Sequence, residues 1–298
     1  MRFFVTGATG FIGSALVPEL INAGYQVLGL TRSEAGARSL AAAGAEVHRG
    51  SLEDLESLKS GAARSDGVIH LAFNHDFSNL RQNSEDDRKV IEKLGEVLAG
   101  SDRPLVISSG TGLARSKTGG PALETDDYVS SAEFPRAASE EAADGLIAKG
   151  GRVMVMRLPQ VHNTSKQGRV TYHIQTARKQ GRVAYVGEGK NRLPAVHVSD
   201  VVRLYRLALE KGQAGSRYHA VGEEGVALRD IAEVIGAGLK MPVESITPEE
   251  APKYFGWMAH LATIDLAASS ALTRQQLGWN PTGPDLLTDL RNMDYTVA

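Results

Sequence analysis

The most constraining feature of this 298-residue chain is its N-terminal stretch, where an apolar run leads directly into three regularly spaced glycines. Residues 3–5 (FFV) have the composition of a buried parallel strand. Gly7, Gly10 and Gly13 follow with the spacing G-x-x-G-x-x-G, and an apolar helical pattern begins within them. This order predicts a dinucleotide site, because such glycines permit a sharp turn, close approach to a pyrophosphate and tight packing of a helix on a strand.

The predicted turn also directs the positive end of a helix dipole toward the cofactor phosphates. An ordinary glycine-rich turn is the alternative interpretation, but the position of the motif between a strand and a helix favours nucleotide binding. The residues of this turn that we expect to contact the cofactor are Gly7, Ala8, Thr9, Gly10, Phe11, Ile12 and Gly13.

The second expected strand, residues 26–30, bears on the choice of cofactor because it is followed by Arg32. The residue just past this strand meets the adenosine ribose, where an acidic side chain would bind a free 2′-hydroxyl and an arginine can bind a 2′-phosphate. Arg32 therefore favours NADP(H) over NAD, and Arg38 could assist. The alternative is a solvated loop arginine.

The remaining strand ends supply further candidate contacts, because ligands in such sheets bind beyond the carboxyl ends of the strands. Strands are expected over residues 45–49, 67–72, 104–109 and 152–157. The cofactor contacts expected at three of these ends are Ser51, Leu52, Leu71, Ala72, Phe73 and Ser108. The loop over residues 113–131 contains three glycine or proline residues and is expected to form a mobile flap.

Six strands that alternate with helices imply an α/β fold of the Rossmann type, with a doubly wound parallel sheet. Beyond Pro159 the alternation weakens. We expect strands at residues 182–186 and 218–221, helices near 172–180 and from Ser199, and a mostly helical stretch from Leu228. The chain is thus expected to form an NADP-binding Rossmann domain over residues 1–160 and a smaller, mostly helical substrate lobe over 161–298, interleaved with the last sheet elements.

Composition narrows the possible partners. The net charge is −2, which gives no support for nucleic acid or an anionic membrane as a partner. The absence of cysteine excludes disulfides, thiolate catalysis and cysteine metal sites, and no apolar run reaches the roughly 18 residues that span a bilayer. We expect a cytoplasmic monomer or homodimer that acts on a small molecule.

Several motifs together resemble the extended or atypical short-chain dehydrogenase/reductase superfamily, which includes nucleotide-sugar epimerases, dehydratases and dihydroflavonol-type reductases. The matching stretches are TGATGFIG (6–13), LTR (30–32), HLA (70–72), VISSGT (106–111), RLPQVH (157–162), PAVHVSDV (194–201) and LGWNP (277–281). They occur in the order of the superfamily and span nearly the whole chain. The resemblance is specific for fold and nucleotide binding, and it leaves the substrate open.

The resemblance implies roles for individual residues. Ser109 matches the serine or threonine that hydrogen-bonds the substrate carbonyl, although a strand-end capping serine is the alternative. Asn83 resembles the structural asparagine of the helix after the fourth strand. Pro159, Val161 and their neighbours up to His162 resemble the segment that contacts the nicotinamide.

The chain departs from the superfamily at the proton donor, a Tyr-x-x-x-Lys pair. None of the eight tyrosines has lysine four residues later. Arg136 and Glu140 take the two positions, and arginine keeps its proton at any working pH, so it can polarise an oxygen but cannot readily protonate it. The alternative for Arg136 and Glu140 is a surface helix pair.

A carbonyl oxygen could still be held and protonated by other groups. Ser109 and Thr111 could hold it, and Arg136 could stabilise its charge. His75, at the end of the fourth strand, is the first candidate proton donor, with His162 and Tyr128 as further candidates. No histidine or carboxylate spacing suggests a metal site.

Three functions fit these observations. The first is an NADPH-dependent reductase of ketones or aldehydes with a non-standard proton donor, which the intact turn, Arg32 and Ser109 favour. The second is a regulator that senses NADP without catalysis, which the missing Tyr-Lys pair favours. The third is a nucleotide-sugar epimerase or dehydratase, whose chemistry depends most on the missing tyrosine.

Overall fold

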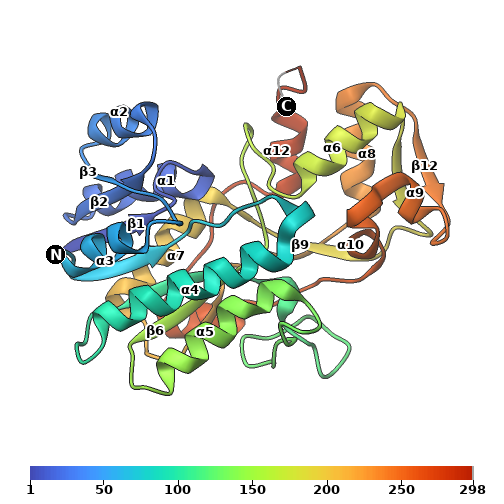
Figure 1. Ribbon diagram of the computed structural model, residues 1–298. Helices are drawn as coiled ribbons and strands as arrows, with labels where there is room; N and C mark the ends of the chain where they lie inside the picture. Colours follow the sequence, from blue (N-terminus) through green and yellow to red (C-terminus); the bar gives the residue numbers. More distant parts are fainter. Residues whose placement is uncertain (297–298) are drawn as a thin grey trace.

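A seven-stranded parallel sheet forms the centre of the computed structural model, which describes residues 1–296 (Figure 1). Its order is β10-β6-β5-β4-β1-β2-β3. The strands are β1 (Arg2–Thr6), β2 (Gln26–Thr31), β3 (Glu46–Arg49), β4 (Gly67–His70), β5 (Leu105–Gly110), β6 (Val153–Leu158) and β10 (Arg217–His219). The predicted doubly wound Rossmann-type fold is confirmed.

Helices cover both faces of this sheet, which explains why its strands are apolar on both sides. The helices on one side are α1 (Phe11–Asn22), α2 (Glu34–Ala42) and α7 (Val198–Lys211), and those on the other are α3 (Leu55–Ala63), α4 (Leu80–Leu98) and α5 (Ala138–Ile147). Short 3₁₀ turns, η1 (Phe77–Asn79), η2 (Thr111–Leu113) and η3 (Pro135–Ala137), lie at or near the carboxyl ends of β4 and β5 and before α5.

The second lobe is built around two small sheets. One has the order β11-β9-β7 and the other pairs β12 with β8 in parallel. Their strands are β7 (Gln160–His162), β8 (Val183–Val186), β9 (Arg192–His197), β11 (Glu223–Ala227) and β12 (Val243–Ile246). The helices are α6 (Val170–Gln180), α8 (Leu228–Leu239), α9 (Ala251–Phe255), η4 (Gly256–Met258), α10 (Ala259–Thr263), α11 (Ala271–Leu277) and α12 (Leu286–Asn292).

The stretch after Leu228 is mostly helical as expected, and β12 is the one short strand in it that the sequence did not predict within residues 228–296. Val243 and Ile246 pair with β8 and pack into apolar clusters of the lobe, so tertiary pairing decides the conformation of this short segment. The second half of the chain also returns to the central sheet, where it contributes β10 and α7. No helix within residues 1–296 is long and apolar enough to cross a membrane.

Candidate active site

The glycine turn between β1 and α1 leaves room only for backbone. Gly7 has φ +66°, and a Cβ there would lie 2.8 Å from the backbone nitrogen of Ala72. A Cβ on Gly13 would collide with the Gly7 carbonyl oxygen. Gly10 begins α1 in extended conformation, and within the described chain no side chain caps this helix and no acidic residue lies in its first turn. The N–H groups of the turn therefore fit a pyrophosphate.

The predicted adenosine contacts lie together at the ends of β2 and β3. Arg32 is exposed, and among residues 1–296 it forms no ion pair within 4.0 Å. The Ser51 hydroxyl and, more weakly, the Arg32 charge lower the pKa of Glu53, so both groups lie near this carboxylate. Arg38 is exposed on α2, whose N-terminus is capped by Ser33. The charges of Arg32 and Arg38 are therefore available to a ligand at the ends of β2 and β3.

A buried polar chain runs beneath the turn from Thr6 to Asp87. Thr6 Oγ1 lies 2.7 Å from His70 Nδ1, and His70 Nε2 lies 2.9 Å from Asp87 Oδ1. The backbone N–H of Ala72 donates to Thr6 Oγ1 over 3.3 Å, which orients the predicted contacts Leu71 and Ala72. Sequence reasoning missed the role of Asp87, although its helical spacing to Asn83 places both on one face of α4.

Arg136 is the last member of this hydrogen-bonded series and lies at the carboxyl ends of β4 and β5. Its guanidinium donates to Asp87 Oδ2 over 3.0 Å and to the Ser108 carbonyl oxygen over 2.9 Å, contacts Ser139, and lies 4.2 Å from the centre of the Phe73 ring. Burial opposes the charge of Asp87, but Arg136 and His70 lower the pKa of this carboxyl. The alternative of an exposed Arg136–Glu140 helix pair is wrong, since the two side chains have different partners.

Glu140 is fully buried and surrounded by donors. It accepts hydrogen bonds of 2.8 Å from both Nε and Nη2 of Arg157, 2.9 Å from Arg217 and 2.8 Å from the Ser109 hydroxyl. Burial raises the pKa of Glu140, but Arg157 and Arg217 outweigh it, so the net direction is downward. The Ser109 hydroxyl thus points to Glu140, and its predicted contact with a substrate carbonyl would require it to exchange this partner.

Tyr128 is also engaged by a carboxylate. Its hydroxyl donates to Asp144 over 2.7 Å, and burial with Asp144 raises its pKa. The expected flap is fixed over residues 122–128, because Ala122 bonds the backbone of Ala267 and Glu124 accepts from Thr273. The Arg115 N–H donates to the Asp127 carbonyl oxygen, so the part of the expected flap without such backbone bonds is shortened to the loop after Arg115.

Most of the other predicted site residues are buried in the core. The Ser108 hydroxyl is buried against the His70 carbonyl oxygen and the Tyr205 hydroxyl, so it offers no side-chain contact to a cofactor. Thr111 is buried in η2. His162 is fully buried with Nδ1 2.7 Å from Asp289, which removes it as a proton donor. The segment from Pro159 to Val161 remains beside the end of β6.

His75 remains in the exposed loop after β4. Its ring lies edge-on to Phe73 at 5.5 Å and to Phe77 at 6.0 Å. Partial desolvation and, to a smaller extent, the charge of Arg136 lower the pKa of His75. A row of aromatic rings that the sequence did not reveal continues from here, since Phe77 stacks on Trp257 at 4.7 Å and Trp257 meets Tyr172 at 5.4 Å.

The sequence profile of the NAD dependent epimerase/dehydratase family matches residues 3–221. Uncharacterized proteins of Schizosaccharomyces pombe and Saccharomyces cerevisiae are 45% and 42% identical over 99% and 98% of this chain, which covers 100% and 98% of theirs. A Stigmatella aurantiaca 4-hydroxy-2-methyl-3-oxo-4-farnesyl-3,4-dihydroquinoline-1-oxide ketoreductase is 28% identical over 83% of this chain and 76% of its own.

Among solved structures, a dTDP-glucose 4,6-dehydratase from Streptomyces venezuelae, with NAD and TYD bound, superposes with a TM-score of 0.77 at 20% identity. This match covers 98% of the present chain and 96% of the dehydratase. It concerns the fold alone, whereas the family profile spans most of the sequence. The chain belongs to the NAD dependent epimerase/dehydratase family.

Proposed function

We propose that the protein is an NADP(H)-dependent reductase of ketones or aldehydes in which Arg136 replaces the usual tyrosine. The observation that carries this proposal is the position of its guanidinium, which Asp87, Ser139 and the Ser108 carbonyl oxygen hold at the ends of β4 and β5. A fixed cation at this edge of the sheet suits an oxygen that becomes negative during reduction.

The residues present fit a nicotinamide dinucleotide, which supplies a hydride when bound. Gly7, Gly10 and Gly13 keep the turn free of side chains, and the N-terminus of α1 has no side-chain cap, so the N–H groups of its first turn would hold the pyrophosphate. The exposed guanidinium of Arg32 supports NADP(H), because nothing within residues 1–296 neutralises it by an ion pair and a 2′-phosphate would.

Arg136 and His75 divide the work of the absent tyrosine. The guanidinium stays charged at all working pH values, so it stabilises a developing alkoxide but does not deliver the proton. His75 follows the same strand as Phe73, over which Arg136 lies, and an imidazole can deliver a proton near neutrality. The ketoreductase among the relatives supports carbonyl reduction as the type of reaction.

Steady-state assays test this proposal with a panel of aliphatic and aromatic ketones and aldehydes. Loss of NADPH absorbance is expected, and Arg136→Met should lower kcat/KM by about 10²- to 10³-fold with unchanged NADPH affinity, because it removes the charge that stabilises the reacting oxygen. Since Asp87 also loses its ion-pair partner, the kinetics are measured under conditions where circular dichroism shows that the variant is folded. Arg115→Met, just before the shortened loop, is the control and should match the unmodified protein. Background turnover across the whole panel, with or without Arg136, would reject the reductase.

A non-catalytic NADP(H)-binding regulator is the second candidate. It is favoured by the Ser109 hydroxyl, which donates to Glu140 and is not directed at a substrate. Tight NADPH binding by calorimetry, no turnover, and a protein partner whose binding depends on the cofactor would support this function over the first.

A further inference from the structure

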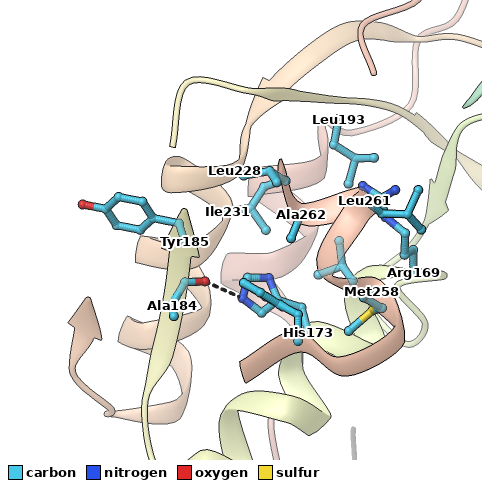
Figure 2. A pocket seen from close by; sticks show the side chains of 12 residues that line it. Arg169, His173, Ala184, Tyr185, Leu193, Leu228, Ile231, Met258, Leu261 and Ala262 are labelled. Carbon is cyan, nitrogen blue, oxygen red and sulfur yellow. Dashed lines mark hydrogen bonds between the residues drawn. The ribbon is translucent and has the colours of Figure 1, made fainter. Parts of the chain in front are cut away.

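A cavity in the second lobe contains a positive charge without a partner. The cavity lies between α6, β8, α8 and α10 (Figure 2). The space open to the centre of a water-sized sphere is about 40 Å³, and all of its empty space, open solvent included, is about 460 Å³. Most of its walls are apolar, formed by side chains such as Val170, Leu193, Leu228, Ile231, Met258 and Leu261.

Arg169 is the charged residue of this cavity. Figure 2 shows its guanidinium close to Leu193 and Leu261. Between residues 1 and 296 no carboxylate lies within 4.0 Å of it and no acceptor hydrogen-bonds it, whereas most other arginines of the chain have such partners. Arg169 is partly buried, and desolvation by its surroundings lowers its pKa to about 10. A cation in apolar surroundings is unfavourable until an anion pairs with it.

No other group of the cavity provides that anion. His173 faces the same space, with Nε2 2.9 Å from the Ala184 carbonyl oxygen, and burial lowers its pKa to about 4, so it is neutral near pH 7. Tyr185 is the remaining polar side chain of the wall, and the Arg229 guanidinium lies 5.8 Å from the centre of its ring. The cavity therefore combines apolar walls with one positive charge.

We propose that this cavity binds the carboxylate end of an apolar ligand, with Arg169 as its ion-pair partner. The cavity shares α6 and the segment around η4 with the aromatic row. Tyr172 and Trp257 adjoin the cavity residues His173 and Met258 in sequence, and both rings meet Phe77 of the aromatic row that begins at His75. This assignment rests on the proposed function, and the substrate class is an apolar oxo acid. Its carbonyl takes a hydride from NADPH and a proton to give a hydroxy acid and NADP⁺.

Calorimetric titration with saturating NADP⁺ tests the assignment, with octanoate as the acid and octanamide as its neutral counterpart. Octanoate should bind at least tenfold more tightly than octanamide, and Arg169→Met should remove this difference. Arg291→Met, which removes an exposed charge from α12 of the same lobe, is the matched control and should preserve it.

Thermal unfolding without ligand separates a binding role from a structural one. Arg169→Met should raise Tm by about 2 °C or more, because an unpaired charge leaves the apolar cavity. Equal affinity for octanoate and octanamide, a lower Tm of Arg169→Met, or Arg169-dependent binding of dTDP in place of octanoate would overturn the assignment. If octanoate binds through Arg169 but no carbonyl compound is reduced, the cavity assignment stands and the reductase function falls.

Discussion

The glycine turn and the neighbouring strand ends of β5 and β6 both face the same edge of the sheet, yet they are built in different ways. The turn leads into a helix N-terminus that no side chain caps, and it packs through glycines that admit no side chain. At β5 and β6, almost every polar group is already paired, with Glu140 joined to Ser109, Arg157 and Arg217. A site made of backbone keeps its donors free for a ligand, whereas a site made of buried charges uses them to hold itself together.

The largest expected effect is a loss of stability when the buried network at β5 and β6 is broken. Glu140→Ala leaves the buried Arg157 guanidinium without its bidentate partner, so the free energy of unfolding should fall by about 3–5 kcal/mol. Urea denaturation measures this change. Glu133→Ala, which removes an exposed partner of Arg115, is the control and should change stability by less than about 1 kcal/mol. A small effect of Glu140→Ala would contradict the assigned network.

Substitutions at the predicted adenosine contacts, at the ends of β2 and β3, should change the preference for NADPH over NADH and leave stability unchanged. Arg32→Ala should weaken NADPH binding by about tenfold and leave NADH binding unchanged, because only NADPH carries the 2′-phosphate. Titration of each cofactor measures both affinities. Arg38→Ala should have a smaller effect in the same direction. If Arg32→Ala weakened the binding of NADPH and NADH equally, Arg32 would not bind the 2′-phosphate.

The buried network should also be sensitive to mild acid. Burial and the charge of Arg157 lower the pKa of His219 to about 4 from 6.5. Between these two pH values the residue is protonated in the unfolded chain and neutral in the folded chain. Stability from this residue is complete above pH 6.5 and is lost as the pH falls toward 4. The loss at pH 5 should be up to about 2 kcal/mol, since each pKa unit corresponds to about 1.36 kcal/mol.

Denaturation at pH 7 and pH 5 measures this dependence. In His219→Gln the difference between the two pH values should be smaller than in the unmodified protein, because the titrating group is gone. An identical difference in both proteins would assign the acid sensitivity to other groups.

The smallest effect should come from Tyr128. Tyr128→Phe removes one hydroxyl that donates to Asp144, so stability should fall by about 1 kcal/mol and kcat should stay the same. A large loss of kcat with unchanged stability would instead return Tyr128 to the list of proton donors.

The geometry of the glycine turn could be predicted from the sequence, and the contacts of the second region could not, for physical reasons. Glycine spacing constrains the backbone locally, so Gly7 and Gly13 indicate their own roles. Glu140 binds residues that lie far from it in sequence, such as Arg217, and no local pattern reports such a contact. The spacing of Arg136 and Glu140 even suggested a surface pair, because helical period does not reveal which face is buried.

The fold shows the same difference between local and distant signals. The strands of the central sheet could be predicted from their apolar runs, since both faces are covered. β12 could not, because Val243–Ile246 becomes a strand only by pairing with β8. The position of Arg169 could not be predicted either, because nothing in the sequence indicated that apolar side chains would surround it.

The pH dependence of kcat/KM for NADPH-dependent carbonyl reduction tests the central claim most directly, which is that Arg136 and His75 share the work of the absent tyrosine. Partial desolvation and the charge of Arg136 lower the pKa of His75, and the proposed reduction uses its protonated form. The rate should therefore rise as the pH falls through a pKa below 6.5, and His75→Gln should abolish this rise. A profile that His75→Gln leaves unchanged would contradict the claim.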